Sequence, residues 1–485
     1  MNILHKWIFL FGFCLGLVSN AQSKYTLIKG TVHAKNRVLK KVLVSNGDTI
    51  VQTDKKGRFE IPVKKGQVVF PIIPTNYTHS NAKKWWYHSL EDINKERVFT
   101  LKKVKTKKEF KFLAIGDVQV GDDKELLYAT KSVLTELLNR NDYDFSLYLG
   151  DLVNDAPELF VPLKKLIDDI PKPSWVVYGN HDRNFNAEQN QQFDFFRKHF
   201  GPETYAFFKN DILFVSLNSI TPAGKYGYKN QYPPNQIRFL SQLLQQIPKD
   251  QQVIISQHVP FVAMKNKEEL IKLLNPFKKV LFLSGHTHTV FQNEIIMPSG
   301  HVIHELTAGA ASGNWWTGQK KWEGIPLSLM SCGTPRGYFE INFKNKDYKI
   351  QYKGINLPAS KQFSYWVGDY NSEPISVLDK TNNIYINVFS GSYKTKVSLK
   401  LTDNTAISMT KERLVDPYIN YIKKSQKENK SPDKNSKASP YLRTKSNHIW
   451  KGTFPKLNKG YHKVDILIED PYFSSIKESI WVFKK

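Results

Sequence analysis

The chain of 485 residues is too long for a single hydrophobic core, so we expect two to four domains. Hydrophobic residues make up 40% of the chain and aromatic residues 13%, which excludes a mainly disordered protein. The formal net charge is +26, and the lysines are scattered along the whole chain. We favour a solvated basic surface, which would still attract anionic substrates, over a dedicated polyanion-binding face, and no specific nucleic-acid motif accompanies the charge.

The first 21 residues are typical of a secretory signal peptide. Lys6 precedes an apolar run over residues 7–18, and small residues follow up to Ala21. The apolar run is short for a transmembrane span, although an uncleaved anchor is the alternative. Cleavage after Ala21 removes Cys14 and leaves Cys332 alone, so no internal disulfide is expected. We expect an exported protein, periplasmic or secreted, whose mature chain has no transmembrane segment.

Two β-rich segments flank the middle of the chain. Residues 24–105 alternate short β-like runs with turn signals, including an Asn-Gly pair at Asn46, and predict a small β-sandwich domain. Residues 355–485 predict a second one, which is interrupted by a polar low-complexity insert over 423–440. We interpret that insert as a solvated loop.

Residues 108–345 have a different pattern. Apolar strand-like runs alternate with segments whose apolar residues recur every three or four positions, such as 124–140 and 233–247. This alternation predicts an α/β domain that carries its functional residues at the carboxyl ends of strands.

Five of the apolar runs in this domain end in polar residues of metal-binding type. In chain order these residues are Asp117 and Gln119, Asp151, Asn180 with His181 and Asp182, His258, and His286 with His288. One polar residue at the end of a strand would indicate a turn in which its hydrogen bonds are made. Five such positions in series, four of them after a glycine, are hard to explain as turns. Buried carboxylates are tolerable where cations meet them.

The series resembles the calcineurin-like metallophosphoesterases, whose motifs run Asp-x-His, Gly-Asp, Gly-Asn-His, a lone His and Gly-His-x-His. The resemblance covers residues 110–343, and the flanking segments are similar to the accessory domains of an exported bacterial branch. It implies a four-layer α/β/β/α sandwich flanked by two small β-sandwiches, with two metal ions at the strand tips.

The resemblance also implies a ligand set. The first metal would be held by Asp117, Gln119, Asp151 and His288, and the second by Asp151, Asn180, His258 and His286, with the Asp151 carboxylate bridging the two. Carboxylate, amide and imidazole ligands together suit Mn, Fe, Zn or Co better than Ca or Mg, and Mn, Fe and Zn are the ions that we favour.

Gln119 departs from the commoner pattern, which has His at this position. We favour ligation through its carbonyl oxygen over the alternative that it only hydrogen-bonds Asp117. Asn154 stands where purple acid phosphatases would supply a Tyr ligand, so a ferric-tyrosinate site is not expected.

His181 differs from its neighbours because the resemblance directs it toward the substrate. A hydroxide that bridges the metals would attack phosphorus, and His181 would stabilise or protonate the leaving oxygen. Asp182 would either orient His181 or form a surface salt bridge, and we do not count it as catalytic.

Five further residues attract attention. For His301 and His304, satisfied polar positions on a strand are favoured over a functional role. Trp315 and Trp316 either pack in a core or stack on a base, sugar or lipid, and the sequence leaves this open. Arg336 either pairs with a phosphate or lies in a surface turn.

These observations favour an exported dinuclear-metal phosphoesterase acting on an anionic phosphate ester. The alternative is a catalytically retired cell-surface or glycan-binding protein on the same fold, and the complete ligand set argues against it. Hydrolysis of monoesters and of diesters both remain open, because loops decide the shape of the pocket.

Overall fold

The structure is a computed structural model that describes residues 25–485 except 82–83, 90–94, 346, 370–376 and 429–443. The predicted signal peptide, with Cys14, and most of the polar insert lie outside the described residues. Within the described part of the chain, no helix is both long and apolar enough to cross a membrane. Cys332 is buried and carries a free thiol.

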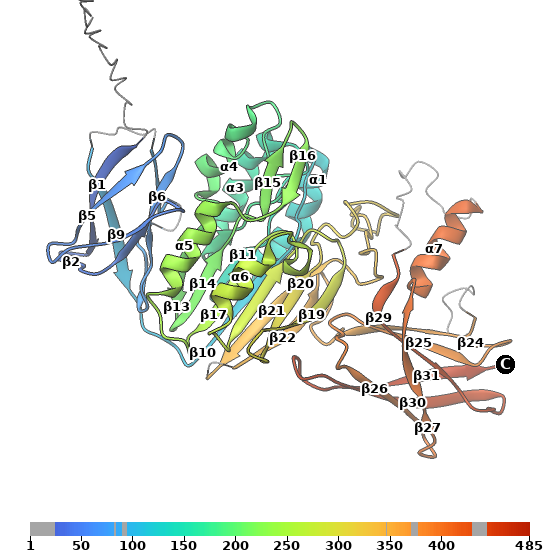
Figure 1. The fold of residues 1–485 in the computed structure, drawn as a ribbon. Helices are drawn as coiled ribbons and strands as arrows, with labels where there is room; N and C mark the ends of the chain where they lie inside the picture. The colour runs from blue at the N-terminus through green and yellow to red at the C-terminus, as the bar shows by residue number, and fades with distance from the viewer. Residues whose placement is uncertain (1–24, 82–83, 90–94, 346, 370–376, 429–443) are drawn as a thin grey trace, which may run out of the picture.

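The middle of the chain forms two mixed β-sheets (Figure 1). The five-stranded sheet has the order β12-β11-β10-β21-β22 and comprises β10 (Glu109–Ile115), β11 (Phe145–Tyr148), β12 (Ser174–Val176), β21 (Gly337–Lys344) and β22 (Asp347–Gly354). The six-stranded sheet has the order β13-β14-β17-β18-β20-β19 and comprises β13 (Tyr205–Lys209), β14 (Ile212–Ser216), β17 (Gln252–Ser256), β18 (Val280–Ser284), β19 (Val290–Ile296) and β20 (Val302–Ala308).

Helices lie between the parallel strands of each sheet, and one further helix lies between β12 and β13, which belong to different sheets. They are α1 (Asp123–Ala129), α2 (Thr135–Leu138), α3 (Phe160–Asp169), α4 (Asp194–Phe200), α5 (Pro234–Leu244) and α6 (Lys267–Leu274). The helical pattern predicted over 124–140 forms α1 and α2, joined by one π-helical turn at Thr130–Leu134. The pattern predicted over 233–247 forms α5.

The two sheets face each other across an aromatic core. The ring of Phe214 on β14 meets Phe112 of β10 and Phe145 of β11 edge-on, at centroid distances of 5.4 Å each. Because crossover helices cover the faces of sheets that contain parallel strands, the layers run helix, sheet, sheet, helix. The predicted α/β/β/α fold is therefore confirmed, with β-rich regions on both sides (Figure 1).

Each flanking region consists of two antiparallel-rich sheets. The N-terminal strands are β1 (Thr26–Ala34), β2 (Arg37–Val38), β3 (Leu43–Ser45), β4 (Ile50–Gln52), β5 (Arg58–Val63), β6 (Val68–Ile72), β7 (Tyr77–His79), β8 (Tyr87–His88) and β9 (Arg97–Lys103). The C-terminal strands are β23 (Phe363–Val367), β24 (Val377–Leu378), β25 (Asn383–Val388), β26 (Lys396–Leu401), β27 (Ala406–Ile407), β28 (Met409–Leu414), β29 (Ser446–Thr453), β30 (Gly460–Glu469) and β31 (Ile476–Lys484), together with helix α7 (Pro417–Lys427). At the expected hairpin, the side-chain oxygen of Asn46 accepts hydrogen bonds from the N–H groups of Asp48 and Thr49, and β3 pairs with β4.

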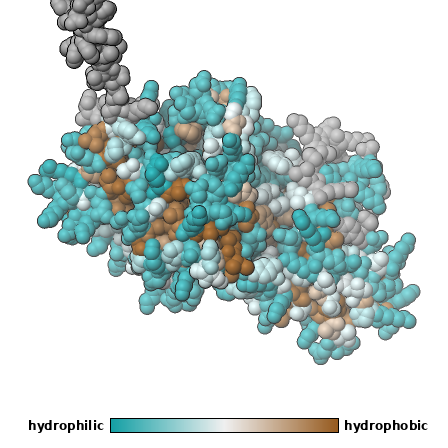
Figure 2. All heavy atoms as spheres, viewed as in Figure 1, coloured by the Kyte–Doolittle hydropathy of each residue, from teal (hydrophilic) through white to brown (hydrophobic). Residues whose placement is uncertain are grey.

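One hydrophobic cluster extends through all three regions. On the N-terminal side the ring of Trp85 packs 5.0 Å from Trp175 and 5.4 Å from Tyr205. On the C-terminal side Asn387 donates a hydrogen bond of 2.9 Å to the carbonyl oxygen of Cys332. Outside this interior the face shown in Figure 2 is mainly hydrophilic, with apolar side chains in small groups.

Candidate metal centre

The side chains predicted to bind metal converge at the carboxyl ends of the strands. The Nε2 atom of His258 lies 3.1 Å from Oδ2 of Asp151, and Nε2 of His288 lies 3.7 Å from Oδ1 of Asp117. Ligand atoms of Asp151, His258 and His286 all lie within 4.8 Å of one another. The structure thus brings together residues from four separate loops.

The remaining predicted ligands belong to the same site. The amide oxygen of Asn180 lies 3.2 Å from Nε2 of His258. A cavity of about 760 Å³ opens over the centre, and the predicted residues that line it are Gln119, Asp151, Asn180, His181, His286 and His288.

Backbone carbonyls orient two of the imidazoles. The Nδ1 atom of His258 lies 2.8 Å from the carbonyl oxygen of Leu149, and Nδ1 of His288 lies 2.6 Å from that of Gly313. A ring that donates from Nδ1 to a carbonyl presents Nε2 as the atom that can bind a metal ion once it is deprotonated. Both Nε2 atoms face the carboxylates.

The backbone at the predicted ligands is strained. Five of these residues have left-handed φ angles, namely 36° at Asp117, 45° at Gln119, 50° at Asp151, 72° at His286 and 50° at His288. This region costs a residue with a side chain on the order of 1–3 kcal/mol, and such strain concentrates at functional sites. Here it turns each side chain from its strand end into the centre.

The glycines of the motifs make room for ligands from neighbouring loops. A Cβ atom on Gly179 would lie 2.1 Å from Oδ1 of Asp151, and one on Gly285 would lie 2.4 Å from Oδ2 of Asp117. Since either contact is far inside van der Waals distance, only glycine allows the loops to approach this closely.

The buried carboxylates of the centre shift the pKa values of the groups around them. Asp117 and Asp151 are both fully buried. Burial, reinforced by the charge of Asp151, raises the pKa of Asp117 well above its usual value. Burial alone would lower the pKa of His258, but the Asp151 carboxylate raises it to about 9. Burial and the charge of His258 lower the pKa of His286 to about 3. Multivalent cations would satisfy both carboxylates and the neutral imidazole.

Gln119 provides a further observation that fits a cation. Its Oε1 atom is buried and has no hydrogen-bond partner, while its Nε2 donates to Oδ1 of Asn154 at 3.5 Å. An unpartnered buried carbonyl costs free energy unless a donor or cation meets it. The alternative of a hydrogen bond from Gln119 to Asp117 is not what the structure shows. The donor set therefore fits divalent metal ions.

His181 lines the same cavity, and both its backbone and its ring are hydrogen-bonded. The backbone N–H of His181 donates to Oδ1 of Asp151 at 2.9 Å, and the ring atom Nδ1 lies 2.7 Å from Oδ1 of Asp155. Burial lowers the pKa of His181, but the hydrogen bond to Asp155 and the charge of Asp151 outweigh it and raise that pKa. The sequence interpretation missed Asp155, although an acidic residue so soon after Asp151 could have indicated it.

Both expectations for Asp182 are wrong. The residue is fully buried, and its carboxylate accepts hydrogen bonds from the N–H groups of Leu152 at 2.8 Å, Val153 at 3.2 Å and Gly179 at 2.9 Å. Asp182 therefore joins two ligand loops through their backbones and neither orients His181 nor forms a surface salt bridge.

The two adjacent tryptophans have different surroundings. Trp316 is buried, and its indole N–H donates to the carbonyl oxygen of Val118 at 2.9 Å. Trp315 lines the cavity, and its ring stacks on His288 at a centroid distance of 4.3 Å. Trp316 therefore packs in the core, and Trp315 contacts the site.

His301, His304 and Arg336 lie outside the cavity. His304 is buried between Tyr348 and Gln292, with hydrogen-bond distances of 2.7 and 2.8 Å, and His301 lies 2.7 Å from the hydroxyl of Ser299. His304 agrees with the favoured interpretation. His301 does not fully agree, because it lies just before β20 and its Nε2 is buried without a hydrogen-bond partner.

Arg336 is neither at the site nor in a surface turn. It is buried, and its guanidinium lies 4.9 Å from the centre of the Trp316 ring. Burial against this aromatic ring explains a cation that the sequence alone could not place.

Arg183, which the sequence interpretation also missed, attaches a hairpin to the site. The hairpin consists of β15 (Ile220–Ala223) and β16 (Gly227–Asn230). Arg183 donates from Nε to the carbonyl oxygen of Asn180 at 2.8 Å, and from Nη1 and Nη2 to those of Gly227 at 2.8 Å and Tyr226 at 2.7 Å. The hairpin in turn brings the hydroxyl of Tyr228 to 3.4 Å from Nε2 of His286.

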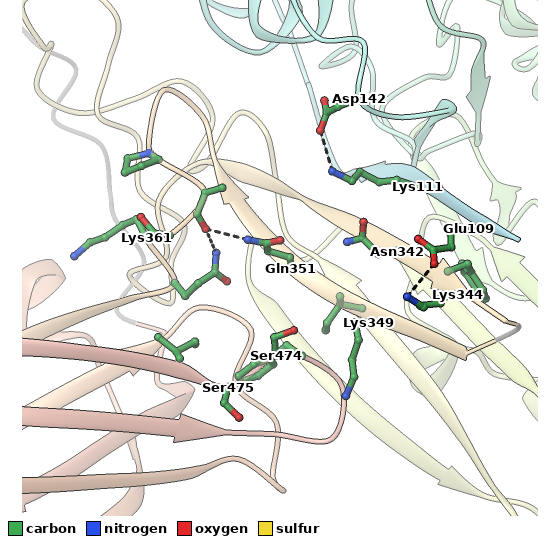
Figure 3. A pocket seen from close by; sticks show the side chains of 18 of the residues that line it. Glu109, Lys111, Asp142, Asn342, Lys344, Lys349, Gln351, Lys361, Ser474 and Ser475 are labelled. Carbon is green, nitrogen blue, oxygen red and sulfur yellow. Dashed lines mark hydrogen bonds and ion pairs between the residues drawn. The ribbon is translucent and has the colours of Figure 1, made fainter. Parts of the chain in front are cut away.

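A larger cavity of about 1160 Å³ lies away from this centre, between the β21–β22 edge and the C-terminal sheets (Figure 3). Several of its charges already have partners, since Lys111 pairs with Asp142 at 2.9 Å and Lys344 with Glu109 at 2.9 Å. Because it contains none of the metal-type cluster, we place the functional site in the smaller cavity.

An α/β/β/α sandwich with carboxylates, amides and imidazoles at its strand tips is an arrangement that fits a metal-dependent hydrolase. Three models of one family match the chain in succession: its N-terminal domain over residues 26–104, calcineurin-like phosphoesterase itself over 110–290, and its C-terminal domain over 305–474. The chain belongs to the calcineurin-like phosphoesterase family, as its motifs indicated. It is therefore a metal-dependent phosphoester hydrolase by family and by donor set.

No curated protein matched the chain. Among solved structures it is similar to an archaeal phosphodiesterase, with 14% identity, a TM-score of 0.26, and coverage of 50% of this chain and 99% of that one. It is also similar to Vps29 of Chaetomium thermophilum, with 12% identity, a TM-score of 0.24, and coverage of 50% of this chain and 97% of that one. A third similar structure is a 5'-nucleotidase of Candida albicans, with 10% identity, a TM-score of 0.31, and coverage of 77% of this chain and 90% of that one. None of these scores indicates a shared fold or activity by itself.

Proposed function

We propose that this protein is a dinuclear-metal phosphoesterase in which His181 assists departure of the leaving group. The observation that carries the proposal is the convergence of two buried carboxylates, three imidazoles and an unpartnered amide oxygen below a cavity that His181 also lines. Bound divalent ions would supply an activated water and neutralise the charge that develops on phosphorus.

The chain's own residues would divide the remaining tasks. Asp151 lies at the middle of the cluster, where its two oxygens contact His258 and the N–H of His181, and it would bridge the ions. Asp117, Gln119 and His288 would complete one ion's ligands, and Asn180, His258 and His286 the other's.

His181 would hold a proton at Nε2. Its Nδ1 contacts Asp155, so Nε2 is the ring atom left for the substrate. The raised pKa of this ring keeps the proton available for the oxygen that leaves phosphorus. A protonated leaving oxygen avoids the cost of expelling an alkoxide.

The test compares metal content with hydrolysis of an aryl phosphomonoester and an aryl phosphodiester. We expect wild-type protein to bind about two equivalents of Mn²⁺ or Zn²⁺ and to cleave at least one ester. His181→Ala should retain the metal and lose turnover by about 10²–10⁴-fold. Metal-loaded protein that cleaves neither ester would contradict the proposal.

We further propose that the protein acts outside the cytoplasm. The apolar segment over residues 7–18 and the small residues that end at Ala21 support this location. Fractionation of expressing cells, with the N-terminal sequence of the recovered protein, tests it. A protein that retains residue 1 and stays in the cytoplasm would contradict export.

A further inference from the structure

We infer that the cavity takes phosphoesters that carry a planar aromatic ring, separated from phosphorus by a sugar-sized linker. The ring would lie against Tyr226 and Phe185. This inference rests on the proposed function for its phosphate-binding end and adds the class of group that the substrate carries at its other end.

The first observation is the size of the cavity. Its volume of about 760 Å³ lies within the range of about 300–1,000 Å³ that drug-sized ligands occupy. A phosphate group alone would leave most of that space to water. The remaining walls therefore contact whatever the phosphate is attached to.

The second observation is a continuous aromatic and cationic wall that leads outward from the metal centre. Tyr228 contacts His286, and the guanidinium of Arg183 lies 5.4 Å from the ring of Tyr228 and 4.4 Å from the ring of Phe185. The rings of Phe185 and Tyr226 follow, with centroids 5.3 Å apart. All four side chains line the cavity.

The wall is held in place by its backbone. Arg183 donates hydrogen bonds from Nε, Nη1 and Nη2 to the carbonyl oxygens of Asn180, Gly227 and Tyr226, respectively. The hairpin that carries Tyr226 is thus tied to the loop that carries the predicted ligand Asn180. Such attachment presents an aromatic side chain in a fixed position, which lowers the entropic cost of binding.

The third observation is exposure. Tyr226 is 65% exposed even though it contacts Phe185. An exposed aromatic side chain at the rim of a deep polar site offers a stacking surface to a planar ligand. Trp315 adds a second aromatic ring to the same cavity, where it stacks on His288.

Spacing along the hairpin sets the length of the linker. Tyr226 lies in the turn just before β16, two positions from Tyr228, so the Cα atoms of the two residues are at most about 7 Å apart. Tyr228 is the residue beside the metal-type cluster, so the stacking surface at Tyr226 lies within about one sugar ring of it. A nucleoside phosphate has its base at this distance from phosphorus.

The reaction itself would be an ordinary hydrolysis. Water supplies the new P–O bond, the ester P–O bond breaks, and a proton passes to the leaving sugar oxygen. A monoester gives a nucleoside and inorganic phosphate, a methyl diester gives a nucleoside and methyl phosphate, and neither hydrolysis needs a further reactant. The aromatic wall contributes binding of the leaving group and takes no part in proton transfer.

The test uses full-length metal-loaded protein and two substrates that differ only in the base. We expect kcat/KM for adenosine 5'-monophosphate to exceed that for ribose 5-phosphate by about tenfold or more, mainly through KM, as base stacking implies. If the enzyme cleaves only diesters, the methyl esters of the same two compounds replace them.

Variants assign the preference to the wall. Tyr226→Ala should bring the ratio of the two kcat/KM values close to one, while Tyr226→Phe, which keeps the ring, should preserve it. The matched control is Tyr461→Ala, because Tyr461 is 73% exposed but lies on β30 in the C-terminal region. A preference that survives Tyr226→Ala would overturn the inference.

A binding measurement separates this inference from the proposed function. Calorimetry with adenosine, which has no phosphate, should show saturable binding to wild type and weaker binding to Tyr226→Ala. Adenosine binding without any ester cleavage would support the proposed aromatic binding surface and contradict the proposed phosphoesterase activity. Equal turnover of both phosphates without adenosine binding would contradict the aromatic binding surface and leave the proposed phosphoesterase activity unaffected.

Discussion

The Oδ1 atom of Asp155 lies 2.7 Å from Nδ1 of His181, and the N–H of Asp155 donates to the carbonyl oxygen of the same histidine at 3.1 Å. Two contacts from one residue fix both the ring and the backbone of His181. The ring of His181 therefore enters the cavity in one orientation, with a hydrogen bond that favours its charged form.

Replacement of Asp155 tests this pairing. Asp155→Asn should lower kcat by about ten- to a hundredfold with little change in KM, because it removes the charge that favours protonated His181. The pKa of His181 is raised in the folded protein, so the protonated form persists to higher pH than in a free histidine. The alkaline limb of the kcat–pH profile should move to lower pH in Asp155→Asn. Asp250→Asn, at an exposed carboxylate in the turn after α5, is the control. An unshifted alkaline limb would contradict the pairing.

Gln119 provides a test of metal binding that does not depend on activity. Its buried, unpartnered Oε1 predicts that Gln119→Leu, which has a similar shape and no oxygen, binds less metal after dialysis than wild type. We expect loss of up to one equivalent, because the remaining ligands of that ion are retained. Gln119→His should restore the metal content. Inductively coupled plasma mass spectrometry measures the metal content of both variants. Full metal content in Gln119→Leu would show that this oxygen is not a ligand.

Gly179 gives a steric prediction. The Cβ atom of Gly179→Ala would lie 2.1 Å from Oδ1 of Asp151, so either that carboxylate or the loop must move. We expect metal content and turnover to fall together, with destabilisation on the order of 1–3 kcal/mol from overpacking. Gly300→Ala is a control for backbone strain without a steric clash, since Gly300 has a φ of 84° and a Cβ there meets no atom within 4 Å, so it should leave metal content and turnover unchanged. Normal metal content in Gly179→Ala would indicate that the loops are less closely packed than described.

His79 predicts how stability depends on pH away from the metal centre. Burial lowers its pKa from 6.5 to about 3, and its ring stacks on Trp85 with Nε2 unpartnered. The unfolded chain therefore binds a proton that the folded chain does not, and stability falls by about 1.4 kcal/mol per pH unit below pH 6.5. In urea denaturation at pH 7.5 and pH 5, His79→Phe should lose less stability than wild type. Equal losses would contradict this assignment.

The sequence predicted the chemistry of the site better than its geometry. The ligand types were visible because each follows an apolar strand, and strand ends in one domain meet at a common edge. Gly179 and Gly285 were visible for the same reason, and their close contacts with Asp151 and Asp117 give the physical basis of the pattern.

The residues that sequence analysis missed act through contacts between distant segments. Asp182 was misassigned because its carboxylate turns back onto the N–H groups of Leu152 and Val153, thirty positions away. Tyr228 approaches the site only because a hairpin folds over it, and Arg183 holds that hairpin through carbonyl oxygens more than forty positions away, which no local pattern predicts. Periodicity and turn propensity describe the chain over a few residues and carry no information about such contacts.

The continuous hydrophobic cluster has a consequence for how the molecule can be divided. Trp85 from the N-terminal region covers Trp175 and Tyr205 of the middle region, and Val388 of the C-terminal region belongs to the same interior. A truncated chain cut at the sequence boundaries would expose these rings to water on one or both sides. We expect truncated chains to aggregate under conditions in which the full-length chain does not. The flanking sheets then form part of the hydrophobic interior of the catalytic region and are not separable domains.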